Sequence, residues 1–92
     1  MQNWEWDETK NQVNLAKHGF GFDFAQLVFD DPLSASRLDQ FEGEERWQTI
    51  GQVGAAVILV VHTLPFDEQP GRIVTARNAT RMERKRYEEG EF

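Results

Sequence analysis

The chain has 92 residues, no cysteine and a formal net charge of −6. A chain this short closes around one core, so we expect a single domain over residues 1–92. The lack of cysteine excludes disulfides, thiolate metal sites and thiol nucleophiles. The sequence shows neither the pattern of a secretory leader nor an apolar stretch of about 20 residues. We therefore expect a cytoplasmic protein with no membrane partner.

The first predicted elements are a short strand and a helix. Residues 4–6 alternate apolar and polar side chains, which is typical of a strand. Asp7 is a good N-cap for a helix over residues 8–17, and Gly19 suits the left-handed position that commonly follows a helix. The apolar stripe of this helix is narrow, and it comprises Val13, Leu15 and Ala16.

A second, shorter helix is predicted to start at Asp23. The Asp23 side chain can cap it, with Gln26 three residues later as the partner in a capping box. Asp31-Pro32 ends the segment, because a residue before proline disfavours the helical conformation. The side chains expected to share its buried face are Phe24, Leu27 and Val28.

After Leu33 the apolar pattern changes and predicts a run of strands. Short breaks that contain glycine or proline separate the candidates, which favours an antiparallel meander. The third candidate is apolar at successive positions, so it should be central in the sheet and covered on both faces. The predicted strands span residues 34–38, 46–50, 57–64 and 72–77.

A basic helix is predicted near the end of the chain. Thr80 and Glu83 form a capping-box pattern, and the helix should extend from Arg81 to about Glu89. Together the elements predict an α+β fold: a short N-terminal strand and two helices, then an antiparallel β-meander and a C-terminal helix outside it. Six of the ten basic residues lie in one segment with a single acid, Glu83, and they are Arg72, Arg77, Arg81, Arg84, Lys85 and Arg86.

A series of short motifs runs in order along the chain. The N-terminal series is Trp4-Glu5-Trp6-Asp7, Lys10-Asn11, Asn14, Lys17-His18-Gly19, Phe22, Ala25, Val28-Phe29 and Asp31-Pro32. The C-terminal series is Glu45-Arg46, Ile50-Gly51, Val60-Val61-His62-Thr63, Arg72-Ile73-Val74, Ala76-Arg77, Ala79-Thr80, Glu83-Arg84 and Tyr87. In this order and spacing the motifs resemble the BrnT family of toxins from bacterial toxin–antitoxin pairs.

The resemblance implies a RelE-like α+β fold and an endoribonuclease that inhibits translation, with RNA as its substrate. It also implies neutralisation by a ribbon-helix-helix antitoxin of the BrnA type, in a hetero-oligomer that binds operator DNA. No cofactor is expected. The chain departs from the family pattern at Asn78, where a basic residue is common, and in its net acidity.

Metal-independent RNA cleavage needs a base for the 2′-hydroxyl, cations around the phosphorane and an acid for the leaving oxygen. Arg46 and Arg77 suit the cationic role, because a guanidinium matches phosphate oxygens. His62 and Glu45 are the candidates for proton transfer. The alternatives are surface ion pairs of the arginines with Glu44, Glu45 or Asp39, a packing role for His62 and a solvated Glu45.

The last helix supplies the candidate RNA-binding residues Arg81, Arg84 and Tyr87. A solvated helix face and a tyrosine that anchors the helix to the core are the alternatives. Two widely spaced histidines without cysteine argue against zinc, and helix termination accounts for Asp30 and Asp31, so no metal site is expected. The alternative function is a non-catalytic partner of an antitoxin-like repressor that modulates its DNA binding.

Overall fold

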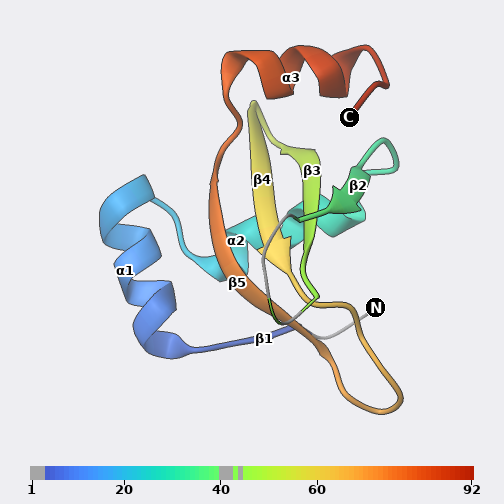
Figure 1. Cartoon of the computed structure of the whole chain (residues 1–92). Helices are drawn as coiled ribbons and strands as arrows, with labels where there is room; N and C mark the ends of the chain where they lie inside the picture. The colour runs from blue at the N-terminus through green and yellow to red at the C-terminus, as the bar shows by residue number, and fades with distance from the viewer. Residues whose placement is uncertain (1–3, 40–42, 44) are drawn as a thin grey trace.

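The computed structural model describes residues 4–39, 43 and 45–92, and its fold is α+β (Figure 1). A short strand and two helical segments precede the main part of the sheet, and one helix follows it, as predicted. In chain order the elements are β1 (Trp4–Trp6), α1 (Glu8–His18), α2 (Phe22–Ala25), the 3-10 helix η1 (Gln26–Asp30), β2 (Ala35–Leu38), β3 (Trp47–Val53), β4 (Ala56–His62), β5 (Gly71–Asn78) and α3 (Arg81–Glu88).

The five strands form one sheet in the order β1-β5-β4-β3-β2. The predicted antiparallel meander from β2 to β5 is confirmed. Strand β1 also joins the sheet, parallel to β5, with Trp4 opposite Gly71, a pairing that the local sequence pattern does not predict. The Trp4 ring lies where a side chain at position 71 would be, since a Cβ there would be 2.2 Å from it. Glycine at this position therefore lets the edge strand dock.

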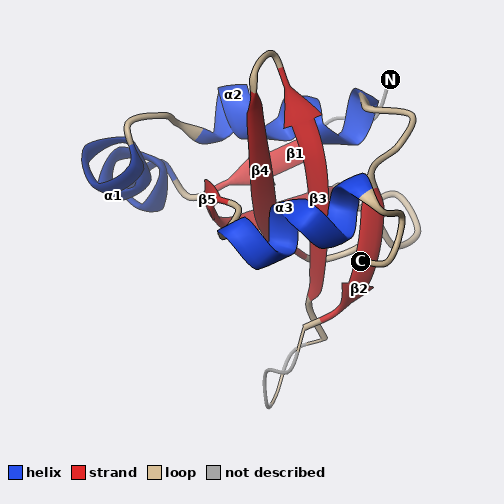
Figure 2. Cartoon of the chain, turned by 90° about the horizontal axis from the view of Figure 1, so that it is seen from above, coloured by secondary structure: helices blue, strands red, loops and turns tan. Residues whose placement is uncertain are grey.

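The predicted central strand is confirmed as β4, the third of five in the sheet. Val57, Ile58, Leu59 and Val60 are all buried. Ile58 and Val60 point to one face, and Val57 and Leu59 to the other, because side chains alternate along a strand. Both faces of the sheet are thus covered, and α2 and α3 pass on opposite sides of β3 and β4 (Figure 2).

The face that carries α2 and η1 forms the apolar core. The prediction that Phe24 and Leu27 are buried is wrong, since Leu27 is 43% exposed. The N-cap is Gly21 and not Asp23; it makes no side-chain cap, and Asn11 Oδ1 accepts the Phe22 N–H at 2.7 Å. The buried side chains recur at every third residue, which fits the tighter turn of a 3-10 helix. The core cluster comprises Phe22, Ala25, Val28, Ile58, Val60, Ile73 and Ala76.

Helix α1 has the predicted caps but not the predicted buried face. Asp7 Oδ1 accepts the Lys10 N–H, and Gly19 has φ 83°. Val13 on the expected apolar stripe is 60% exposed, whereas Asn14 is buried. Asn14 Oδ1 accepts the N–H of Ala76, and its amide donates to the carbonyl of Phe20. The helix therefore covers the outer edge of β5 through an amide and not through an apolar stripe.

The remaining boundaries differ from prediction at β3. The strand predicted over residues 46–50 continues to Val53, and the turn that follows comes at Gly54, which has φ 60°. A Cβ at Gly51 would be 2.8 Å from the carbonyl oxygen of Val28, so η1 packs directly on the strand there. The capping box of Thr80 and Glu83 at the start of α3 is confirmed.

Candidate functional site

His62, a candidate for proton transfer, lies in the interior at the end of β4. It is 2% exposed, and the rings of Trp4 and Phe29 meet it edge-on at centroid distances of 5.1 and 4.9 Å. Its Nδ1 is 2.9 Å from the carbonyl oxygen of Thr63, and its Nε2 is 2.6 Å from Thr49 Oγ1. The ring is therefore buried between two aromatic rings, and both of its nitrogens are within hydrogen-bond distance of protein groups.

The partners of His62 define its tautomer. A carbonyl only accepts, so Nδ1 carries the hydrogen, and Nε2 of the neutral ring accepts from the Thr49 hydroxyl. Ser36 Oγ is 2.6 Å from Thr49 Oγ1 and in turn donates to it. Burial lowers the pKa of His62, although the hydrogen bond to Thr63 opposes this. The neutral ring joins β2, β3 and β4 through one chain of hydrogen bonds.

Arg77, a candidate for phosphate binding, points from β5 toward α3. Its Nη1 and Nη2 donate to the two carboxylate oxygens of Glu83 at 2.7 and 3.0 Å. Hydrogen bonds from Arg77 outweigh burial and lower the pKa of Glu83 to about 2. The pKa of Arg77 is raised by the same contact. In this conformation the guanidinium thus holds an internal carboxylate.

Arg37, which the sequence analysis did not single out, is the arginine that the structure brings to Arg77. Its Nη2 lies 3.8 Å from Glu83 Oε2. Its Nε donates to Gln48 Oε1 at 2.8 Å, and the Gln48 amide donates to Asp39 Oδ1 at 2.6 Å. The one feature of the sequence that bears on Arg37 is the alternation in the predicted strand 34–38, which places Arg37 and Ala35 on the same face. This pattern does not indicate which strand lies beside it.

Arg46 and Glu45, the other catalytic candidates, lie just before β3. Arg46 is half-buried and directly precedes Trp47, the first residue of β3. Arg77 of β5 pairs with Leu59 of β4, and Leu59 pairs with Ile50 of β3. Arg77 therefore lies level with Ile50. Four residues of strand separate the two levels, or about 13 Å. Glu45 is exposed and its Oε1 accepts from Trp47 Nε1 at 3.3 Å. Glu44, considered as an ion-pair partner, is outside the described residues.

Helix α3 presents two different faces. Arg81, Arg84, Lys85 and Arg86 are exposed, and Arg84 Nε is 3.9 Å from Glu88 Oε1. Glu83 and Tyr87, one turn apart, face inward. The Tyr87 hydroxyl donates to Asp31 Oδ2, and burial together with this hydrogen bond raises the pKa of Tyr87 to about 12.

Asp31 joins α3 to the β3–β4 hairpin and to the end of η1. Its Oδ2 also accepts the Gln52 N–H at 2.8 Å, and its Oδ1 accepts the Leu33 N–H at 2.9 Å. Burial acts to raise the pKa of Asp31, but these hydrogen bonds and that from Tyr87 leave it below the ordinary value. Asp31 therefore serves as a fixed anionic anchor for the end of α3.

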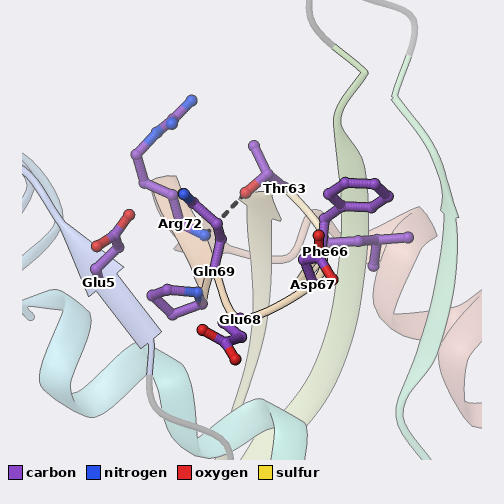
Figure 3. Close-up of a pocket in the computed structure, with 9 residues that line it drawn as sticks. Glu5, Thr63, Phe66, Asp67, Glu68, Gln69 and Arg72 are labelled. Carbon is purple, nitrogen blue, oxygen red and sulfur yellow. Dashed lines mark hydrogen bonds between the residues drawn. The ribbon is translucent and has the colours of Figure 1, made fainter.

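A pocket of about 710 Å³ lies between β1 and the loop that joins β4 to β5 (Figure 3). Glu5, Asp67 and Glu68 line it, with Arg72, whose backbone N–H donates to Thr63 Oγ1 at 2.9 Å. Three carboxylates against one guanidinium make this pocket unfavourable for a phosphodiester. The expected catalytic residues do not line it.

The described residues hold neither a cluster of metal-ligating side chains nor a helix that could cross a membrane. Over residues 4–39, 43 and 45–92, no group of three or more His, Asp or Glu side chains is placed to share a metal ion. Over the same ranges, none of the helices combines the length and apolar character that crossing a bilayer requires.

A family model matches residues 6–83 of the chain, and it describes the ribonuclease toxin, BrnT, of type II toxin–antitoxin systems. The match covers most of the sequence, from the end of β1 into α3, and so includes Arg37, Arg46, His62, Arg77 and Glu83. No curated protein matches the chain closely enough to count as a relative.

Proposed function

The chain belongs to the BrnT family of ribonuclease toxins from type II toxin–antitoxin systems, and from this premise we propose that it is a metal-independent endoribonuclease that inhibits translation by cleaving RNA. The family match is the observation that carries the proposal. The structure adds support, because the guanidinium groups of Arg37 and Arg77 both reach α3, and the same helix carries exposed basic side chains.

Phosphate binding is the first role to assign. We assign it to Arg77 and Arg46, whose guanidinium groups can neutralise the charge that develops on the phosphorane. The bidentate contact of Arg77 with Glu83 supports its share of the role, because a carboxylate and a phosphate present similar pairs of oxygens to a guanidinium. Arg46 lies at a level about 13 Å away along the strand direction, so it would contact a different phosphate of the same RNA strand, beyond the adjacent one.

Proton transfer is the second role. Glu45 is exposed at the start of β3 beside Arg46, which favours it as the base for the 2′-hydroxyl. His62 is enclosed, and both of its ring nitrogens are already hydrogen-bonded. We therefore assign His62 a positioning role, in which it fixes the end of β4 beside the start of β3.

The outer face of α3 supplies a third contact with RNA. Arg81 and Arg84 are exposed there and can bind successive phosphates. Tyr87 faces the opposite way and is hydrogen-bonded to Asp31, so stacking on a base would require it to leave that contact. Its first role in the conformation seen is to anchor α3.

Neutralisation completes the proposed function. We expect a ribbon-helix-helix antitoxin of the BrnA type to bind the toxin, and the hetero-oligomer to bind operator DNA through the antitoxin. The basic face of α3 suits an acidic segment of such a partner. Co-expression of the antitoxin should abolish toxicity and yield a complex that shifts an operator DNA fragment.

The test uses purified protein and a structured RNA in the presence of EDTA. The wild type should cleave, Arg77→Ala should lower the rate by at least about 100-fold, and Lys17→Ala, which removes an exposed cation from α1, should not. Induction of the wild type should also arrest growth and translation. Intact RNA and normal growth in the absence of antitoxin would refute the enzyme.

A second candidate function is a non-catalytic partner that tunes the DNA binding of an antitoxin-like repressor. The observation that favours it is the occupancy of Arg77 by Glu83, together with the net charge of −6. RNA cleavage with EDTA present supports only the first function. A change in operator affinity without cleavage supports only the second.

A further inference from the structure

A carboxylate of α3 lies between two guanidinium groups from distant strands of the sheet. Glu83 binds Arg77 of β5 through both oxygens, and its Oε2 is 3.8 Å from Nη2 of Arg37 on β2. Strands β4 and β3 separate β5 from β2. The two arginines therefore extend across one face of the sheet toward a single point, on the side where α3 passes in front of the strands (Figure 2).

The Arg37 side chain is held in place by groups that leave its terminal nitrogens directed at the Glu83 carboxylate. Its Nε donates to Gln48, which is itself fixed by Asp39. The ring of Phe92 stacks on the guanidinium, with 4.1 Å between Cζ and the ring centroid. A guanidinium that is oriented through Nε and one face presents its terminal nitrogens as a fixed fork.

The contact that Glu83 makes is of a kind that another anion can replace. The side chains of Arg77 and Glu83 are 38% and 14% exposed, so the pair lies at the border with solvent, where a dissolved anion can reach the guanidinium. No residue of α3 is buried, and its inward contacts are made by Glu83 and Tyr87. The helix is thus held to the sheet by polar contacts at both of its ends.

We propose that Arg37 and Arg77 together form a phosphodiester-binding site for RNA, and that Glu83 occupies this site as an internal substitute for the phosphate. RNA binding and the Glu83 contacts then exclude one another, so the first turn of α3 must withdraw before the substrate can bind. The inference rests on the proposed function, because it takes RNA as the ligand, and it adds Arg37 to the substrate-binding residues.

The test measures the affinity for a fluorescent single-stranded RNA that carries 2′-O-methyl groups and so is bound but not cleaved. Glu83→Gln should tighten binding about tenfold, because the competing carboxylate is neutralised. Arg37→Ala in the Glu83→Gln background should cancel the gain and reduce the slope of log Kd against log salt concentration by about 0.7, the value for one phosphate contact on a single strand.

The matched control is Glu88→Gln, which removes the same charge from the exposed side of the same helix. It should change the affinity less than twofold. Equal effects of Glu83→Gln and Glu88→Gln would overturn the proposal, because they would reduce it to overall charge. Unaltered binding on Arg37→Ala in either background would overturn it as well, and this variant changes a half-exposed surface side chain, so a folding failure is not expected.

The failure of this inference can be told apart from failure of the ribonuclease function. The binding probe cannot be cleaved, so it reports the site alone, and ordinary RNA with EDTA reports the reaction alone. Cleavage of ordinary RNA with equal affinities for the two glutamine variants would leave the enzyme intact and remove the Glu83 site. Tighter binding by Glu83→Gln without any cleavage would do the reverse.

Discussion

The two faces of the sheet are held by different kinds of interaction. On one face, Phe22, Ala25 and Val28 pack against the apolar side chains of β4 and β5. On the other, α3 is held by Glu83 on Arg77 and by Tyr87 on Asp31, and no residue of that helix is buried. A dissolved molecule cannot replace a side chain packed in the apolar core. An anion from solution can replace the carboxylate of an ion pair at the border with solvent. The first face therefore determines stability, and the second is suited to binding.

The largest expected effect is on the apolar face. Phe22→Ala should lower the free energy of unfolding by about 3–5 kcal/mol, because a fully buried ring leaves a cavity. Phe24→Ala, two residues away on the exposed side of the same helix, should cost less than about 1 kcal/mol. Urea unfolding followed by circular dichroism measures both. Similar losses for the two variants would erase the distinction between the buried and exposed sides of α2.

A second effect on the same face depends on pH. The pKa of His62 is lowered from 6.5 in the folded chain, so below about pH 6.5 the unfolded chain takes up a proton that the folded chain resists. Stability should thus fall as the pH falls below 6.5, by at most about 1.4 kcal/mol per pH unit. The same unfolding curves in His62→Gln should lack this component, and an unchanged pH dependence would contradict the buried neutral ring.

On the polar face the effects should be smaller. Glu83→Gln should lower the free energy of unfolding by about 1 kcal/mol through loss of the ion pair with Arg77, because glutamine can still complete the capping box. The pKa of Glu83 is lowered from 4.5 to about 2, so this contribution is complete above pH 4.5 and is lost as the pH falls toward 2. Thermal melts between pH 2 and 6 measure it. A loss as large as that of Phe22→Ala would make α3 part of the core.

The smallest expected effect concerns the far end of α3. Tyr87 is the only tyrosine, so its ionisation can be followed directly by difference absorbance. Its pKa is raised to about 12, and Asp31→Asn should lower it toward 10 by removing the anionic acceptor. The contact stabilises the fold below pH 10 and is lost as the pH rises through 12. An ordinary tyrosine pKa in the wild type would show that this end of α3 is undocked.

Local signals in the sequence determined the parts of the fold that depend on near neighbours. Asp7, Gly19 and the Thr80–Glu83 box were readable because each cap joins groups within four residues. The apolar run of β4 fixed the central strand, and the ordered motifs indicated the BrnT family. These features depend only on the spacing of residues along the chain, which can be read directly from the sequence.

Tertiary structure alone decided the features that join distant parts of the chain. Asn11 caps α2 in place of Asp23, and Asn14 accepts a hydrogen bond from Ala76, 62 residues away. The buried sides of α1 and α2 therefore differ from those that the sequence pattern predicts. Glu83 brings together Arg77 of β5 and Arg37 of β2, two strands that are separated in the sheet by β4 and β3. The physical reason is that a buried donor or acceptor must be satisfied by whichever group packing brings near it, and packing is set by the sheet order, which spacing along the chain does not state.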